Sequence, residues 1–143
     1  MIAEASIVVR ASVERLRAVV LDPEAYAAAD TKVSRIEIES RTADGLVARI
    51  HGRFGPVRSM LRARYTVHDR RIDLDMLQGR LRGFHAEFRF EPEGDGVRLT
   101  HREAYDFGYG PATPLVQWAL QGWATRSVEA EVRALKVAAE GSR

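Results

Sequence analysis

The chain has 143 residues, of which 45% are hydrophobic and 29% charged, and its formal net charge is +2. This length and composition are typical of one globular domain with a single hydrophobic core, so residues 1–143 are treated as that domain. The absence of cysteine excludes disulfides, thiol catalysis and cysteine-ligated metals. A nearly balanced charge also does not favour nucleic acid as a partner.

The N-terminal segment MIAEASIVVR carries Glu4 and has no basic region before its short apolar run. It therefore does not resemble a signal peptide. No stretch of the sequence approaches the ~18 apolar residues of a membrane span. We expect a cytoplasmic protein without stable membrane insertion, present as a monomer or a homodimer.

The N-terminal third predicts one strand followed by two short helices. Residues 3–9 are rich in β-branched side chains, which favour a strand. Ser12 is a suitable N-cap for a helix whose apolar residues recur at helical spacing as far as Val20. Pro23 is favourable in the first turn of a second helix, PEAYAAA.

Six segments with alternating apolar and polar residues follow, and each predicts a strand. Turn signals such as Asp44-Gly45 and Gly55-Pro56 separate them. The six segments span residues 33–40, 46–54, 57–67, 71–76, 84–90 and 98–107. Because short turns join them, consecutive strands should be antiparallel, with one apolar and one charged face.

Residues Leu115–Glu140 contain no proline and have apolar residues at helical spacing. This pattern predicts one helix of roughly 25 residues, about 37 Å long. It is the only predicted element large enough to cover the apolar face of the sheet. The expected fold is α+β: a curved seven-stranded antiparallel sheet wrapped around the C-terminal helix, with a cavity between sheet and helix.

Three segments also resemble a known family: VVRASVERLRAVVLDPEAYAAAD, FRFEPEGDGVRLTHREAYDF and EVRALKVAAE. They are similar to the START/Bet v 1-like (SRPBCC) helix-grip superfamily, in particular its bacterial polyketide cyclase/dehydrase branch. The resemblance covers nearly the whole chain and implies a deep, mostly hydrophobic pocket. Its members range from aromatase/cyclases to lipid and hormone binders and interaction proteins. The sequence departs from the family at Asp30, often Trp in relatives, and at His101 and Glu103, where relatives are usually apolar.

His101, Glu103 and Tyr105 lie on the Val97–Leu99 face of the last strand and are the candidate catalytic residues. Residues two apart on a strand are about 6.6–7 Å apart, so their side chains can reach one region of a pocket. Burial raises the pKa of a carboxylate, and a nearby carboxylate favours the charged form of histidine. The pair can therefore serve as general acid and base, with Tyr105 orienting a carbonyl. Three alternatives stay open: a structural network in which these groups satisfy one another, a solvated position at the mouth of the pocket, and a bulge that turns both side chains to the outer face.

The remaining candidate ligand-binding residues come from the inner face of the sheet and the first half of the C-terminal helix. They are Tyr65, Leu74, Met76, Phe88, Phe90, Trp118, Gln121 and Thr125. Gln121 and Thr125 are expected to form a polar corner opposite His101 and Glu103. The aromatic residues would equally suit a hydrophobic core.

Two further expectations concern the surroundings of the cavity. Loops 54–57 and 77–83 should lie at one end of the sheet. The resemblance implies that these loops gate the cavity, and ordinary hairpin turns are the open alternative. Met60 should point to the outer face of the sheet. No metal is expected, because His101 and Glu103 lack a third ligand at recognisable spacing. No cofactor motif is present, so no cofactor is expected.

Three functions remain open from the sequence. The first is binding of a small hydrophobic molecule, lipid-like, aromatic or polyketide-like, in the cavity. The second is an enzyme of the polyketide cyclase, aromatase or dehydratase type that uses His101 and Glu103 as acid and base. The third is an interaction module without a ligand.

Overall fold

The structure is a computed structural model that describes residues 1–141, and their element order matches the prediction. The bounds are β1 (Ile2–Val9), α1 (Val13–Leu21), α2 (Pro23–Ala29), β2 (Val33–Thr42), β3 (Gly45–Phe54), β4 (Val57–Val67), β5 (Arg71–Gln78), β6 (Gly83–Glu93), β7 (Gly96–Asp106), the 3-10 helix η1 (Gly110–Ala112) and α3 (Thr113–Gly141). The predicted strands are each present, most of them a few residues longer than expected.

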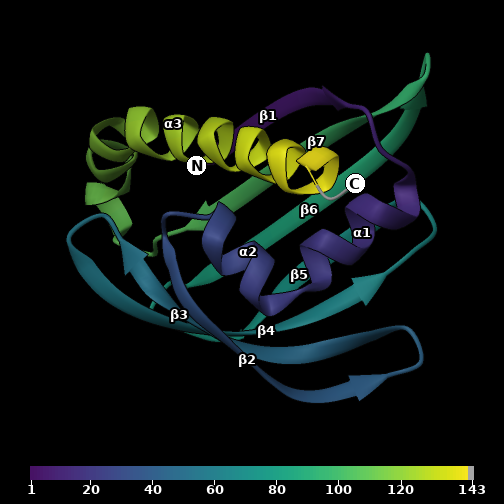
Figure 1. The fold of residues 1–143 in the computed structure, drawn as a ribbon. Helices are drawn as coiled ribbons and strands as arrows, with labels where there is room; N and C mark the ends of the chain where they lie inside the picture. The colour runs from purple at the N-terminus through teal and green to yellow at the C-terminus, as the bar shows by residue number, and fades with distance from the viewer. Residues whose placement is uncertain (142–143) are drawn as a thin grey trace.

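The strands form one antiparallel sheet in the order β1-β7-β6-β5-β4-β3-β2. β1 pairs with β7, so the first strand lies beside the last, and β2 forms the opposite edge. Figure 1 shows the sheet bending around α3, with α1 and α2 beside that helix. The predicted α+β helix-grip fold is confirmed.

Local sequence signals account for the short helices and for one tight strand pairing. The Ser12 side chain accepts a hydrogen bond from the Arg15 amide at 3.0 Å, and Asp22 caps α2 in the same way. Gly45 lies where a Cβ would be 1.8 Å from the carbonyl oxygen of Tyr65. Only glycine therefore allows β3 to approach β4 at this point.

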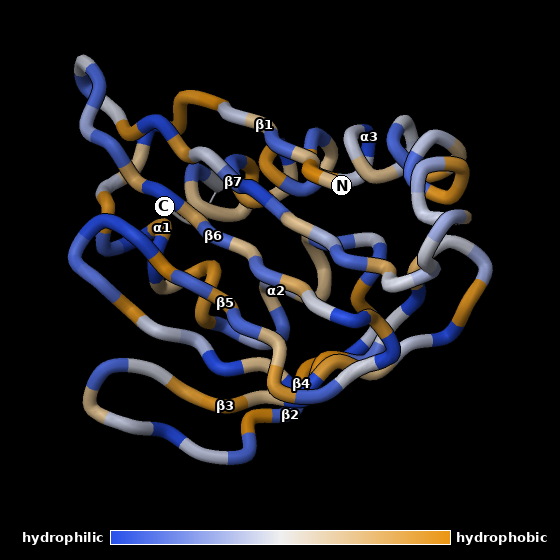
Figure 2. Tube along the Cα trace, turned by 180° about the vertical axis from the view of Figure 1, so that it is seen from behind, coloured by the Kyte–Doolittle hydropathy of each residue, from blue (hydrophilic) through white to orange (hydrophobic). Residues whose placement is uncertain are grey.

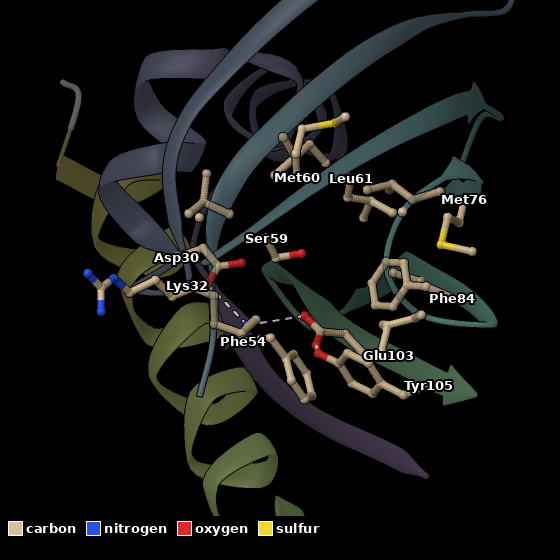
Figure 3. A pocket seen from close by; sticks show the side chains of 18 of the residues that line it. Asp30, Lys32, Phe54, Ser59, Met60, Leu61, Met76, Phe84, Glu103 and Tyr105 are labelled. Carbon is tan, nitrogen blue, oxygen red and sulfur yellow. Dashed lines mark hydrogen bonds and ion pairs between the residues drawn. The ribbon is translucent and has the colours of Figure 1, made fainter. Parts of the chain in front are cut away.

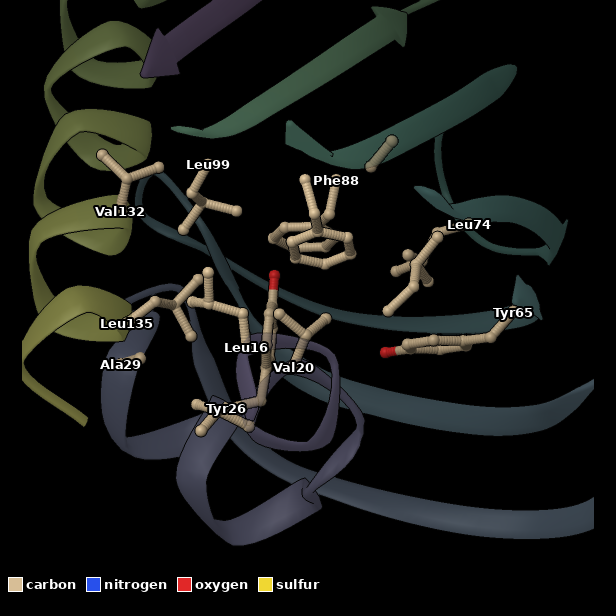
Figure 4. Close-up of a cluster of buried hydrophobic side chains, with 14 of the residues drawn as sticks. Leu16, Val20, Tyr26, Ala29, Tyr65, Leu74, Phe88, Leu99, Val132 and Leu135 are labelled. Atoms are coloured by element: carbon tan, nitrogen blue, oxygen red, sulfur yellow. The ribbon is translucent and has the colours of Figure 1, made fainter. Parts of the chain in front are cut away.

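Burial follows the alternation in the strands. In β5, Ile72 and Leu74 are buried, whereas Asp73 and Asp75 point to the outer face. Figure 2 shows the same change between hydrophobic and hydrophilic residues along the neighbouring strands. The buried side chains of the sheet meet those of the helices in one core, which Figure 4 shows around Phe88 and Leu135.

α3 covers one part of the sheet rather than all of it. Its buried face is Ala124, Ser127, Val128, Glu131, Val132, Leu135 and Ala139. This face packs mainly against β1, with further contacts to β7, α1 and α2. The concave surface over the middle strands is therefore left for a cavity. Among residues 1–141, no helix is long and apolar enough to span a bilayer.

Candidate functional site

A cavity of about 100 Å³ lies in the concave face of the sheet, beside the end of α2. Residues of β3 to β7 form most of its wall, which is largely apolar. Figure 3 shows Leu61, Met76 and Phe84 around this space. Asp30, Lys32, Glu103 and Tyr105 add polar groups to the wall. The cavity thus has the mixed lining typical of a small-molecule site: mostly apolar, with a few placed polar groups.

The two turns expected at one end of the sheet both contribute to the cavity. Phe54 comes from the end of β3, and residues 79–81 come from the segment between β5 and β6. Met60 is among the lining residues, together with its neighbours Ser59 and Leu61. The register between β3 and β4 is unbroken here and pairs Met60 with His51, so the predicted alternation along β4 is kept.

The predicted site residues of the sheet divide into two groups. The cavity wall includes Leu74, Met76, Glu103 and Tyr105. Buried in the hydrophobic core, and not lining the cavity, are Tyr65, Phe88 and Phe90. These three aromatic residues therefore belong to the core, the alternative that the sequence left open.

The contribution expected from the first half of α3 is not found. Trp118 is 79% exposed, and neither it nor Gln121 nor Thr125 lines the cavity. The Gln121 amide instead donates to the carbonyl oxygen of Ile2 at 2.9 Å and to the Thr125 hydroxyl at 3.1 Å. The reason is the position of α3 along β1, which turns this part of the helix away from the concave surface.

The polar partners of His101 and Glu103 come from a position six residues further along α3 than predicted. Glu131 is 1% exposed, and its carboxylate lies 3.3 Å from Nε2 of His101. It also accepts a hydrogen bond from the Tyr26 hydroxyl. The predicted polar corner therefore exists, but Glu131 and Ser127 supply its helix side in place of Gln121 and Thr125.

His101 is fully buried behind the cavity wall. Its Nδ1 lies 3.1 Å from the carbonyl oxygen of Glu87, and its Nε2 lies 3.0 Å from Glu103. The ring stacks on Phe88, with centroids 4.0 Å apart. Burial lowers the pKa of this imidazole, but Glu131 and Glu103 outweigh burial and raise it to about 10. His101 is therefore protonated and is held in place by these contacts. It does not line the cavity.

Lys32 connects this buried pair with the cavity. Its ammonium lies 3.1 Å from Asp30, 3.3 Å from Glu103 and 3.5 Å from Glu131, and it donates to the Ser127 hydroxyl at 2.8 Å. Figure 3 shows Lys32 between Asp30 and Glu103. We call the eight residues joined in this way the buried polar network: Tyr26, Asp30, Lys32, His101, Glu103, Tyr105, Ser127 and Glu131.

The network combines two cations with three carboxylates. Burial raises the pKa of Asp30, Glu131 raises it further, and Lys32 partly opposes both, which leaves it at about 7. The pKa of Glu131 falls to about 2, because His101 and Lys32 together outweigh its burial. The charges therefore balance when Asp30 is protonated, and the network carries one excess negative charge when it is ionised.

We expect the Asp30 carboxyl to titrate with a midpoint near pH 7 in the folded protein. The reason is that its ionisation adds a third negative charge inside a buried network. Carboxyl carbon chemical shifts followed by NMR across the neutral range would measure this midpoint, and Asp30→Asn should remove the signal that moves. A midpoint close to the ordinary value of about 4 would contradict the expectation.

The sequence offered no third metal ligand beside His101 and Glu103, but the structure places Glu131 there. Ligand atoms of the three residues lie within 4.8 Å of one another. The ammonium of Lys32 contacts both carboxylates, at 3.3 and 3.5 Å. Lys32 therefore already supplies the positive charge that a metal would bring, and we assign no metal to this cluster.

Sequence reasoning missed Tyr26, Lys32, Ser127 and Glu131 as members of the site, and noted Asp30 only as a departure from the family. The sequence did contain a signal for Glu131. Glu131 follows Val128 by three residues and precedes Leu135 by four, which puts a carboxylate in the apolar stripe of the helix. Tyr26 and Lys32 carried no comparable signal, because their partners lie about a hundred residues away in the chain.

An open antiparallel sheet that grips a long helix and encloses a cavity defines a helix-grip domain of the ligand-binding type. Residues 2–140 match the family described as polyketide cyclase / dehydrase and lipid transport, and the chain belongs to that family. The predicted resemblance is therefore confirmed. No significant match is found among curated protein sequences.

Solved structures share this fold over nearly the whole chain. A Thermus thermophilus protein, TTHA0849, superposes with a TM-score of 0.88 at 17% identity, covering 99% of both chains. A START superfamily protein from Mycobacterium smegmatis superposes with a TM-score of 0.79 at 19% identity, and the match covers 99% of each chain. The Zhui aromatase/cyclase from Streptomyces sp. R1128 gives 0.79 at 18%, covering 98% of this chain and 93% of its own. At these identities the comparison establishes the fold.

Proposed function

We propose that this protein binds a small hydrophobic molecule in the cavity over β3–β7. The observation that carries the proposal is the largely apolar wall interrupted by the hydroxyl of Tyr105 and the carboxyl of Asp30. Burying an apolar ligand against such a wall is favourable by about 25 cal/mol per Å². The two polar groups would fix the orientation of a ligand hydroxyl or carbonyl.

The size of the cavity narrows the choice of ligand. Its volume of about 100 Å³ is below the ~300–1,000 Å³ of common ligand pockets. It adjoins a cleft of about 620 Å³, and Lys32, Arg53 and Ser59 are among the residues that line both. We infer a ligand whose apolar part fills the inner cavity and whose remainder extends into the cleft.

We expect a tryptophan in the cavity wall to weaken ligand binding. The neutral fluorescent probe N-phenyl-1-naphthylamine should bind the wild type, and Ala86→Trp should weaken this binding by about tenfold or more. Ala86 is 2% exposed and lines the cavity, so the added side chain has no other space. Fluorescence titration measures the effect.

Because Ala86→Trp can also disturb folding, Ser59→Trp at the half-buried cavity mouth is the second variant. Thr66→Trp is the matched control, since it lies on the same strand and lines neither the cavity nor the cleft. Probe binding that survives both cavity variants would contradict the proposal. Wild-type protein that binds no probe would favour an interaction module without a ligand.

An enzyme of the cyclase or dehydratase type is the second candidate, and Asp30 is the observation that favours it. This carboxyl lines the cavity, and its pKa of about 7 suits a general base at neutral pH. Glu103 and Tyr105 also face the cavity. His101 would act only through Glu103, as a positioning residue. In such an enzyme, turnover would rise across the pH range of the Asp30 titration.

A further inference from the structure

Three arginines without acidic partners surround the mouth of the cavity. Arg53 of β3, Arg58 of β4 and Arg80 of the segment between β5 and β6 line the outer cleft and are exposed. Over residues 1–141, none of these side chains forms an ion pair or a hydrogen bond. Of the described residues, no aspartate or glutamate lines this cleft.

The same two strands contain an arginine pair that is neutralised. Arg49 and Arg62 are direct cross-strand partners, and Glu39 accepts from both, at 2.5 and 2.8 Å. Arg53 and Arg58 are also direct cross-strand partners, but no carboxylate lies between them. Like charges directly opposite each other destabilise a sheet pair. The cleft therefore keeps an uncompensated positive charge that an anion would relieve.

The wall of the cavity has the opposite character. Asp30 and Glu103 line the cavity but not the cleft, and together with Glu131 behind the wall they neutralise the ammonium of Lys32. An anionic group inside the cavity would meet the carboxyl groups of Asp30 and Glu103 and be repelled. A negatively charged ligand is consequently oriented by the protein, with its apolar part inward and its anionic group at the cleft.

We propose that the outer cleft binds the carboxylate or phosphate group of an anionic amphiphile whose apolar part occupies the cavity. The proposal rests on the proposed function and adds the chemical class of the ligand. Arg53, Arg58 and Arg80 supply the donors, because guanidinium groups pair with carboxylate and phosphate in charge-assisted hydrogen bonds. Arg53 and Arg80 line both the cavity and the cleft, so they stand where the two parts of the ligand meet.

The test compares decanoate and decyl phosphate with decanol, which has the same apolar chain and no charge. Binding is measured by displacement of N-phenyl-1-naphthylamine from the wild type. Both anions should bind about tenfold tighter than decanol, and added salt should reduce the difference. The tighter of the two anions identifies the preferred group, carboxylate or phosphate.

The triple variant Arg53→Gln/Arg58→Gln/Arg80→Gln should lose this preference while it binds decanol and the neutral probe as the wild type does. The matched control is Arg41→Gln/Arg64→Gln/Arg70→Gln, which loses the same charge from exposed positions outside the cavity and cleft. It should keep the preference for anions.

Equal binding of decanol and the anions by the wild type would overturn this inference and leave the proposed function standing. An equal loss in the control variant would also overturn it, because net charge alone would then explain the preference. If the wild type binds neither the neutral probe nor the alcohol nor the anions, both the proposed function and this inference fall.

Discussion

Lys32→Met should lower the free energy of unfolding at neutral pH by about 3–5 kcal/mol, the range measured when one partner of a buried ion pair is removed. The ammonium contacts Asp30, Glu103 and Glu131, and its pKa is raised because these carboxylates outweigh its burial. Without it, three buried carboxylates face the single charge of His101. Urea unfolding followed by circular dichroism would measure the loss.

The chain provides a matched control for this variant, since Lys136 is its only other lysine. Lys136 forms an i,i+4 pair with Glu140 on α3, at 2.7 Å, near the surface. Such a pair contributes about 0.3–0.5 kcal/mol, so Lys136→Met should have a small effect. Losses of similar size in the two variants would contradict the role assigned to Lys32. Lowering the pH should restore part of the stability of Lys32→Met, because protonation of Asp30 removes one of the unpaired charges.

The fold was predictable because its signals are local. Alternation in the strands, the turn signals and the cap at Ser12 each depend on residues close together in sequence. The position of α3 on the sheet was not predictable. The spacing of its apolar residues shows which face of the helix is buried, but not which strands that face covers. Placing α3 along β1 rather than over the middle of the sheet moved Trp118 to the surface.

The candidate site was predictable where it lies on one strand. The alternation of β7 placed His101, Glu103 and Tyr105 on the inner face, and all three are buried there. Their partners were not predictable, because Lys32 and Glu131 reach them from elements far away in the chain. Charge compensation explains why these buried charged residues occur together. A carboxylate at position 103 or 131 is tolerated in the core only if cations at 32 and 101 accompany it.

The same network sets how stability depends on pH. His101 has a folded-state pKa of about 10 against an ordinary value of 6.5, so the folded state holds its proton more tightly than the unfolded chain. Its contribution is fully present below pH 6.5 and is lost as the pH rises through 10. The pKa of Asp30 is raised from 3.8 to about 7, so the folded state also holds this proton more tightly than the unfolded chain. Stability therefore falls as the pH rises from 3.8 to about 7. Glu131, lowered from 4.5 to about 2, loses its contribution only as the pH falls below 4.5.

These titrations predict that stability is highest on the acidic side of neutrality and falls by a few kcal/mol between pH 6.5 and 10, since one pKa unit corresponds to about 1.4 kcal/mol. Urea unfolding at a series of pH values would measure the slope.

His101→Gln should be less stable at neutral pH and should flatten the slope above pH 6.5, because the proton that the folded state retains is gone. His85→Gln is the control, since this half-exposed imidazole lies on the outer face beside Asp75. A slope that persists unchanged in His101→Gln would show that His101 is not the group responsible, and would remove the argument that a buried imidazolium balances Glu103 and Glu131.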